Sequence, residues 1–158
     1  MYSSQTLPER TAHGGPTSRR LLLVSIFPAL TAGVAFELFL GHRHDYAGHY
    51  AAGYGGTLGA LMVGLKSLPA KQFSTRGTSG VVWICIGCIL LGAAFEATLF
   101  RLAKFDEVDF CNQSLGAVLA AIVALSYVNE TKPADRLFDY GLIVGIAFLG
   151  AGGVFSVA

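Results

Sequence analysis

Two carboxylates lie well inside apolar stretches of this sequence, where an ionised group is costly. Glu37 and Glu96 are the two acids in such positions. An acid within a membrane helix is by default a functional hypothesis, for proton relay or for cation binding. Both residues also precede a basic residue by a few positions, Arg43 and Arg101, so snorkelling and charge pairing are the structural alternative. Glu37 and Glu96 are therefore candidate intramembrane acids.

Histidines and cysteines with suggestive spacings occur in two further places. His42, Asp45 and His49 stand at i, i+3 and i+7, which would place them on one helical face in a conceivable arrangement for zinc. Histidines at a membrane boundary also serve as interfacial anchors, and we expect no metal site here. Cys85 and Cys88 form a C-x-x-C pair without the βαβ pattern of a redox motif or the histidine of a haem site, so we expect buried thiols.

The elements that must hold these residues are membrane helices. Of the 158 residues, 53% are hydrophobic and 13% charged, whereas soluble domains carry about 25% charged residues. Five apolar stretches approach the ~20 residues that cross about 30 Å of hydrocarbon as a helix. We therefore expect an all-α polytopic membrane protein of five transmembrane helices. The second and fourth stretches are the weakest candidates for a membrane span, so four spans with one re-entrant segment are the alternative. The stretches are Leu21–Leu40, Tyr46–Leu65, Gly80–Phe100, Phe110–Val128 and Leu137–Ala158.

Basic residues fall unequally on the two sides of a five-helix arrangement. Eight lie on the side of the N-terminus, and three, Arg43, Arg101 and Lys104, lie on the other. The positive-inside rule then predicts an N-terminus on the cytoplasmic or matrix side. We expect residues 1–20 to form a polar tail and residues 21–158 to form the transmembrane domain. The net charge of +1 offers no basic surface for nucleic acid.

Two short matches in the same order indicate an internal repeat. Gly33–Glu37 (GVAFE) recurs as Gly92–Glu96 (GAAFE), an offset of 59 residues. Thr57–Leu61 (TLGAL) recurs as Ser114–Val118 (SLGAV), an offset of 57 residues. The pattern favours a duplicated helical hairpin, to which the fifth helix is added.

Small residues form a row along the second stretch. In a bilayer, such rows let helix backbones approach closely and pack by van der Waals contact. Packing within the chain, docking onto another subunit and lining of a polar path are the three readings of this face. A second row, Ala51, Gly55 and Gly59, widens it. The first row consists of Gly48, Ala52, Gly56, Ala60 and Gly64.

The segment that contains this row resembles a known family. Residues Gly48–Lys66, with stacked small residues ending in a lysine, look like the glycine-rich helix of the small mitochondrial inner-membrane translocase family, which includes import-channel subunits and an accessory subunit of respiratory complex I. The segment Val128–Arg136, followed by a glycine-rich helix, is similar to a loop and helix of the complex I relative. The resemblance implies a multi-pass protein of the mitochondrial inner membrane and carries no catalytic residue over.

These observations predict a non-catalytic accessory subunit of a large mitochondrial respiratory-chain complex, with its N-terminus on the matrix side. Its partners would be other membrane subunits and lipids, and not nucleic acid. We expect no enzyme activity and no cofactor of its own, while a bound phospholipid stays open. Gly56→Leu should then release the subunit from its assembly. The alternative is a small membrane transporter or channel-like protein that uses Glu37 and Glu96.

Overall fold

The computed structural model describes residues 18–40, 44–98, 106–128 and 132–155, and nearly all of them are helical. Within these residues there is no β-strand, so the expected all-α class is confirmed. The helices are α1 (Ser18–Leu40), α2 (His44–Ser67), α3 (Ala70–Thr98), α4 (Glu107–Leu125) and α5 (Asp135–Phe155).

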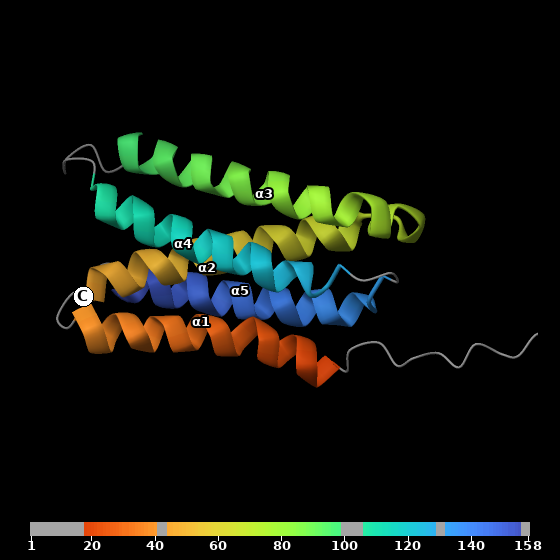
Figure 1. Cartoon of the computed structure of the whole chain (residues 1–158), viewed down its shortest axis with the longest axis horizontal. Coiled ribbons are helices and arrows are strands. Elements are labelled where there is room, and N and C mark those ends of the chain that lie inside the picture. The colour runs from red at the N-terminus through yellow and green to blue at the C-terminus, as the bar shows by residue number, and fades with distance from the viewer. Residues whose placement is uncertain (1–17, 41–43, 99–105, 129–131, 156–158) are drawn as a thin grey trace, which may run out of the picture.

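The five helices lie side by side along one axis, and consecutive helices run in opposite directions (Figure 1). As a result α1 begins at one end of the bundle and α5 finishes at the other. α2 runs the length of the bundle as one continuous helix of 24 residues, about 36 Å at 1.5 Å per residue. The second apolar stretch therefore forms one unbroken helix.

Charged residues separate between the two ends of the bundle. All described lysines and arginines belong to the end at which α1 begins, which we call the basic end; they are Arg19, Arg20, Lys66, Lys71, Arg76, Lys132 and Arg136. Most described acids belong to the opposite end, which we call the acidic end; they are Glu37, Asp45, Glu96, Asp106, Glu107 and Asp109. The remaining two, Asp135 and Asp139, are in the first turns of α5, at the basic end.

α2 is the central helix, because it contacts each of the other four and packs most extensively on α5 and α4. By length and apolar composition, α1, α3, α4 and α5 could each cross a membrane, whereas α2 does not meet that criterion. Its position explains the difference: the surrounding helices separate much of its glycine, histidine and tyrosine content from lipid. α1 is the most loosely attached helix and makes no contact with α3.

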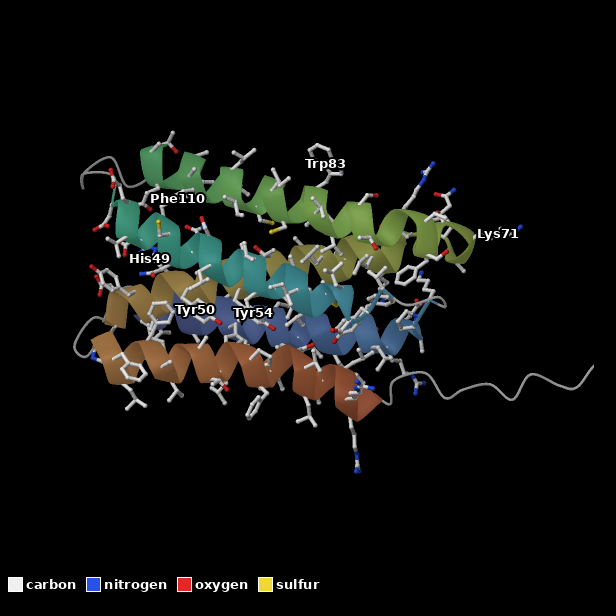
Figure 2. All side chains as sticks on the ribbon, in the orientation of Figure 1. His49, Tyr50, Tyr54, Lys71, Trp83 and Phe110 are labelled. Atoms are coloured by element: carbon white, nitrogen blue, oxygen red, sulfur yellow. The ribbon has the colours of Figure 1, made fainter. Side chains whose placement is uncertain are left out.

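Large apolar side chains point outward, which is the reverse of a soluble bundle. Trp83 is 71% exposed, and Figure 2 shows it directed away from the helices. Such a surface suits a hydrocarbon environment, so the chain is a helical membrane protein. Other exposed apolar side chains are Phe27, Leu38 and Phe39 on α1, Leu90 on α3, Ile122 on α4, and Ile143 and Ile146 on α5.

Glycines bring α2 and α5 into backbone contact. A Cβ added to Gly55 would lie 2.3 Å from the backbone nitrogen of Leu149 and 2.5 Å from the carbonyl oxygen of Gly145. A Cβ on Gly145 would in turn meet the backbone of Gly59 at 2.8 Å. The second small-residue row of α2 therefore makes the closest approach to α5.

The first row is divided between packing and exposure. Gly48 and Ala52 lie against Gly152 of α5. Gly56 is half-buried and Ala60 is exposed. A Cβ on Gly64 would meet the side chain of Ile84 on α3; the corresponding Cβ on Gly56 would touch only Leu149, at 3.8 Å. The row thus packs within the chain at its two ends and leaves an exposed strip on α2 between them.

Candidate functional site

A group of polar side chains gathers at the acidic end, between α2, α3 and α4. Its first element is the start of α4, where the Asp106 carboxylate accepts hydrogen bonds from the backbone N–H groups of Val108 and Asp109 (2.9 and 3.3 Å). This N-cap satisfies donors that a helix end leaves free. It fixes the first turns of α4, which carry Asp109 and Asn112.

His49 of α2 faces Asp109 across the interface between the two helices. Its Nε2 atom lies 3.5 Å from the Asp109 carboxylate, and the two side chains are 21% and 15% exposed. Figure 2 shows His49 and Phe110 together at this end of the bundle, with Tyr50 and Tyr54 further along α2. A histidine that faces a carboxylate can share or pass a proton with it.

Glu96 of α3 and Asn112 of α4 form the more deeply buried part of the group. They are 8% and 9% exposed. The charges of Asp106, Asp45 and, most weakly, Glu96 act on the Asp109 carboxylate, which also faces His49. Glu96 is the least exposed of the three titratable side chains Glu96, Asp109 and His49.

Several polar atoms of this group have no hydrogen-bond partner among the described residues. They are Oδ1 of Asp109, Nδ2 of Asn112 and Oγ of Ser114. Within the same residues, no hydrogen bond or ion pair joins the Glu96 carboxylate to another side chain. Buried polar atoms are ordinarily paired, so this is the part of the described structure with the most unused hydrogen-bonding capacity.

Gln113 places α4 against both neighbouring helices at this level. A Cβ added to Gly92 of α3 would lie 2.1 Å from the side-chain nitrogen of Gln113. A Cβ added to Gly53 of α2 would lie 2.1 Å from the backbone carbonyl oxygen of Gln113. Gly53 is therefore required by the close approach of the Gln113 backbone, whereas at Gly92 the flexible Gln113 side chain occupies the space. Gly92 holds α3 near α4, one turn before Glu96.

Buried hydroxyl groups continue from this group toward the basic end. Tyr50 donates a hydrogen bond to the carbonyl of Ala29 (3.5 Å), and Tyr54 donates one to the carbonyl of Ser25. The Ser25 hydroxyl donates to the carbonyl of Leu21 (2.8 Å), so Tyr127 is the donor in its 2.8 Å contact with Ser25. These bonds attach α1 to α2 and α4.

The structure separates the two acids that the repeat pairs. Glu37 lies on α1, with its carboxylate 3.1 Å from Nδ1 of His44, and the two side chains are 36% and 51% exposed. Since α1 and α3 are not in contact, Glu37 and Glu96 lie in separate parts of the bundle. Arg43 and Arg101, their expected partners, lie outside the described residues.

The other candidate ligands are also dispersed. Among the described residues no three histidine, cysteine or acidic side chains are placed to hold a metal ion; His42 lies outside these residues. Cys85 is buried, with its thiol 3.6 Å from the carbonyl of Ala117, and Cys88 is partly buried. The thiols occupy the packed side of α3, as expected for small apolar residues.

Comparisons of the chain with protein-family models, with curated proteins and with solved structures found no match. The site therefore has to be interpreted from its own residues. Asp109 and the tyrosines were not among the residues singled out in the sequence. Asp109 follows Asp106 by three positions at the start of an apolar stretch, and Tyr50 and Tyr54 are one helical turn apart, which are signals that could have identified them.

Proposed function

We propose that this chain is a small proton-handling membrane protein, in which Glu96 takes up and releases a proton through Asp109 and His49. This is the transporter or channel-like alternative of the sequence analysis, with Glu96 retained and Glu37 removed. The observation that carries it is a buried Glu96 whose charge acts on Asp109, the partner of His49, at a place where polar atoms of Asp109 and Asn112 are left unpaired.

The chemistry of the group favours a proton over other ligands. Neighbouring carboxylates raise each other's affinity for protons, and a histidine beside them can accept and release a proton. Asp109 and His49 are more exposed than Glu96, so they can exchange the proton with the surroundings at the acidic end. The hydroxyls of Tyr50, Tyr54 and Tyr127 extend the buried polar groups toward the basic end.

The test compares two glutamates that share a repeat position. The purified protein is reconstituted into liposomes that contain a pH-sensitive dye, and proton entry is measured under a potassium diffusion potential. Glu96→Gln should abolish the proton flux above that of empty liposomes. Glu37→Gln is the matched control and should leave the flux unchanged, because Glu37 is partly exposed on α1, which does not contact α3.

Two results would contradict the proposal. One is a Glu96→Gln flux equal to that of the unmodified protein, and the other is an equal loss in both variants. Asp109→Asn adds a second readout: if the histidine pair delivers the proton, the pH dependence of the flux should shift in this variant.

An accessory subunit of a larger assembly is the second candidate, and the outer face of α3 favours it. Gly80 and Gly87 have no other group within 4 Å of an added Cβ, and Trp83 between them is exposed. An open glycine face of this kind permits a further helix to pack. The resemblance in sequence suggests that the larger assembly is a respiratory-chain complex of the mitochondrial inner membrane. The N-terminus of the chain would then lie on the matrix side.

This candidate is tested by native electrophoresis of mildly solubilised membranes. Gly87→Leu should release the chain from a large complex, if it belongs to one. Gly56→Leu on α2 is the comparison, because Gly48 and Ala52 of its row are covered by α5. Migration of the unmodified chain as a monomer or small oligomer would exclude this function.

A further inference from the structure

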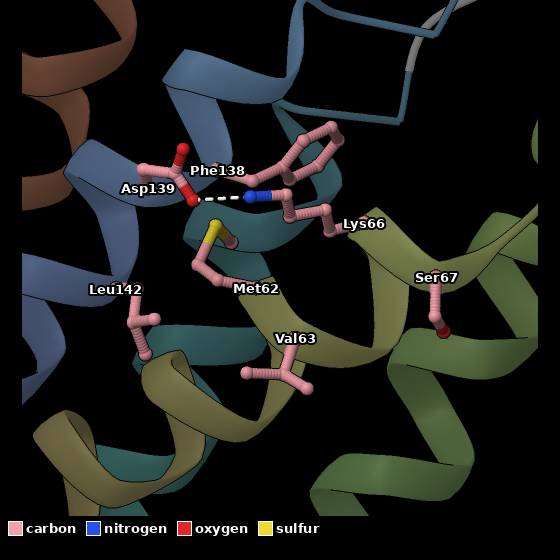
Figure 3. Close-up of a pocket in the computed structure, with 7 residues that line it drawn as sticks. All are labelled: Met62, Val63, Lys66, Ser67, Phe138, Asp139 and Leu142. Atoms are coloured by element: carbon pink, nitrogen blue, oxygen red, sulfur yellow. Dashed lines mark hydrogen bonds and ion pairs between the residues drawn. The ribbon is translucent and has the colours of Figure 1, made fainter.

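A pocket of about 310 Å³ lies at the basic end, where the last turns of α2 meet the first turns of α5 (Figure 3). Four of its lining residues are apolar: Met62, Val63, Phe138 and Leu142. Its polar side chains are those of Lys66, Asp139 and Ser67. Because Val63 is 57% exposed on the outside of the bundle, the pocket faces the surroundings of the protein and not its core.

The polar part of the pocket holds one charge of each sign. Nζ of Lys66 donates a hydrogen bond to Oδ1 of Asp139 at 2.5 Å, and the two side chains are 41% and 49% exposed. This hydrogen bond raises the pKa of Lys66 above its ordinary value, so the ammonium stays charged. An ammonium has three N–H donors and a carboxylate two oxygens, so both groups can bind a further partner.

The other nearby cation is already engaged. Nζ of Lys132 donates to the carbonyls of Lys66 and Leu68 at the end of α2 (2.7 and 2.9 Å). It also lies 3.8 Å from the carboxylate of Asp135. The charged groups that line the pocket are therefore the Lys66 ammonium and the Asp139 carboxylate, and their charges cancel.

We propose that this pocket binds a phospholipid whose headgroup carries a primary ammonium, as phosphatidylethanolamine does. The phosphate accepts a hydrogen bond from Lys66, and the ammonium donates one to Asp139. Hydrogen bonds between such charged groups are the strong ones. Phosphatidylcholine has no N–H to donate to Asp139, and phosphatidylglycerol has no cation to pair with it.

The exposed strip on α2 gives the lipid chain a place to lie. Ala60 is one turn before Val63 on the exposed side of α2, and half-buried Gly56 precedes it by another turn. Their small side chains leave room along the helix between α3 and α5. An acyl chain that begins in the apolar part of the pocket can follow this strip toward the middle of the membrane.

The experiment is native mass spectrometry of the purified full chain in detergent with equal amounts of phosphatidylethanolamine, phosphatidylcholine and phosphatidylglycerol of identical acyl chains. Phosphatidylethanolamine should be retained about tenfold more than phosphatidylcholine, the change that one charge-assisted hydrogen bond is worth. Asp139→Asn should remove this preference. Asp135→Asn is the matched control: it changes the same charge on the same helix, outside the pocket, and should preserve the preference.

Two further variants keep the proposal testable if Asp139→Asn does not fold. Lys66→Gln should lower retention of all three lipids, because each carries the phosphate. Ala60→Leu should lower retention of all three lipids without changing their ratio. Equal retention of the three lipids by the unmodified protein, a preference for phosphatidylglycerol, or an equal effect of Asp135→Asn would overturn the proposal.

Discussion

Replacing Gly55 by alanine tests the close approach of α2 and α5 most directly. The added Cβ would lie 2.3 Å from the backbone nitrogen of Leu149, and ordinary van der Waals contact begins at 3.4 Å. The helices must therefore separate by about 1.1 Å along this contact. The groups in the way are backbone atoms, which cannot rotate aside as a side chain can.

The expected cost follows from two opposing contributions. Overpacking of a close-packed interface costs typically ~1–3 kcal/mol, and the upper part of that range applies because backbone is displaced. Alanine in place of glycine favours a helix by about 0.8–1.0 kcal/mol. Gly55→Ala should therefore lower the free energy of unfolding by about 2 kcal/mol.

Gly56→Ala is the matched control on the next residue. Its Cβ would touch only the side chain of Leu149, at 3.8 Å, so the helix preference remains and stability should stay equal or rise by up to ~1 kcal/mol. Both variants are unfolded by SDS in mixed micelles and followed by near-ultraviolet circular dichroism of the buried tyrosines. Equal stabilities for Gly55→Ala and Gly56→Ala would refute the placement of α5 on the Gly55 side of α2.

Three further predictions concern single contacts. Tyr54→Phe removes the hydrogen bond to the carbonyl of Ser25 and should lower the free energy of unfolding by about 1 kcal/mol in the same assay; no change would mean that this bond does not hold α1. Lys132→Met removes two hydrogen bonds to the end of α2 and should lower the unfolding midpoint more than Arg136→Met, since the Arg136 side chain is exposed. Cys111 is exposed in the first turns of α4, at the acidic end; with Cys85 and Cys88 replaced by alanine, a membrane-impermeant maleimide should label it from the side opposite the predicted N-terminus, and labelling from the other side would reverse the orientation.

The apolar stretches predicted the positions of the helices well, because each membrane helix separately needs about 20 apolar residues. The largest difference between an apolar stretch and its helix is in α3. The helix begins at Ala70, whereas the third apolar stretch begins at Gly80. Hydropathy measures the part of a helix that can lie in hydrocarbon. Polar residues such as Lys71 and Arg76 are compatible with the same helix continuing beyond it.

The site was predicted less completely, because burial depends on which helices become neighbours. Glu37 and Glu96 have equivalent sequence surroundings, yet the first is partly exposed and the second buried. The difference arises because α3 packs on α4 at Gly92 and Gln113, a contact between residues that no local pattern links. For the same reason, the pairing of His49 with Asp109 could not be read from spacing.

The central position of α2 has a consequence for how the chain is made. During synthesis α2 emerges after α1, before the helices that cover it exist, and it is the one helix here that lacks the apolar content of a membrane span. Lipid would meet its glycine backbone and its polar side chains directly, at a cost. We therefore expect insertion of α2 into the membrane to depend on its packing against α4 and α5, the helices that it contacts most.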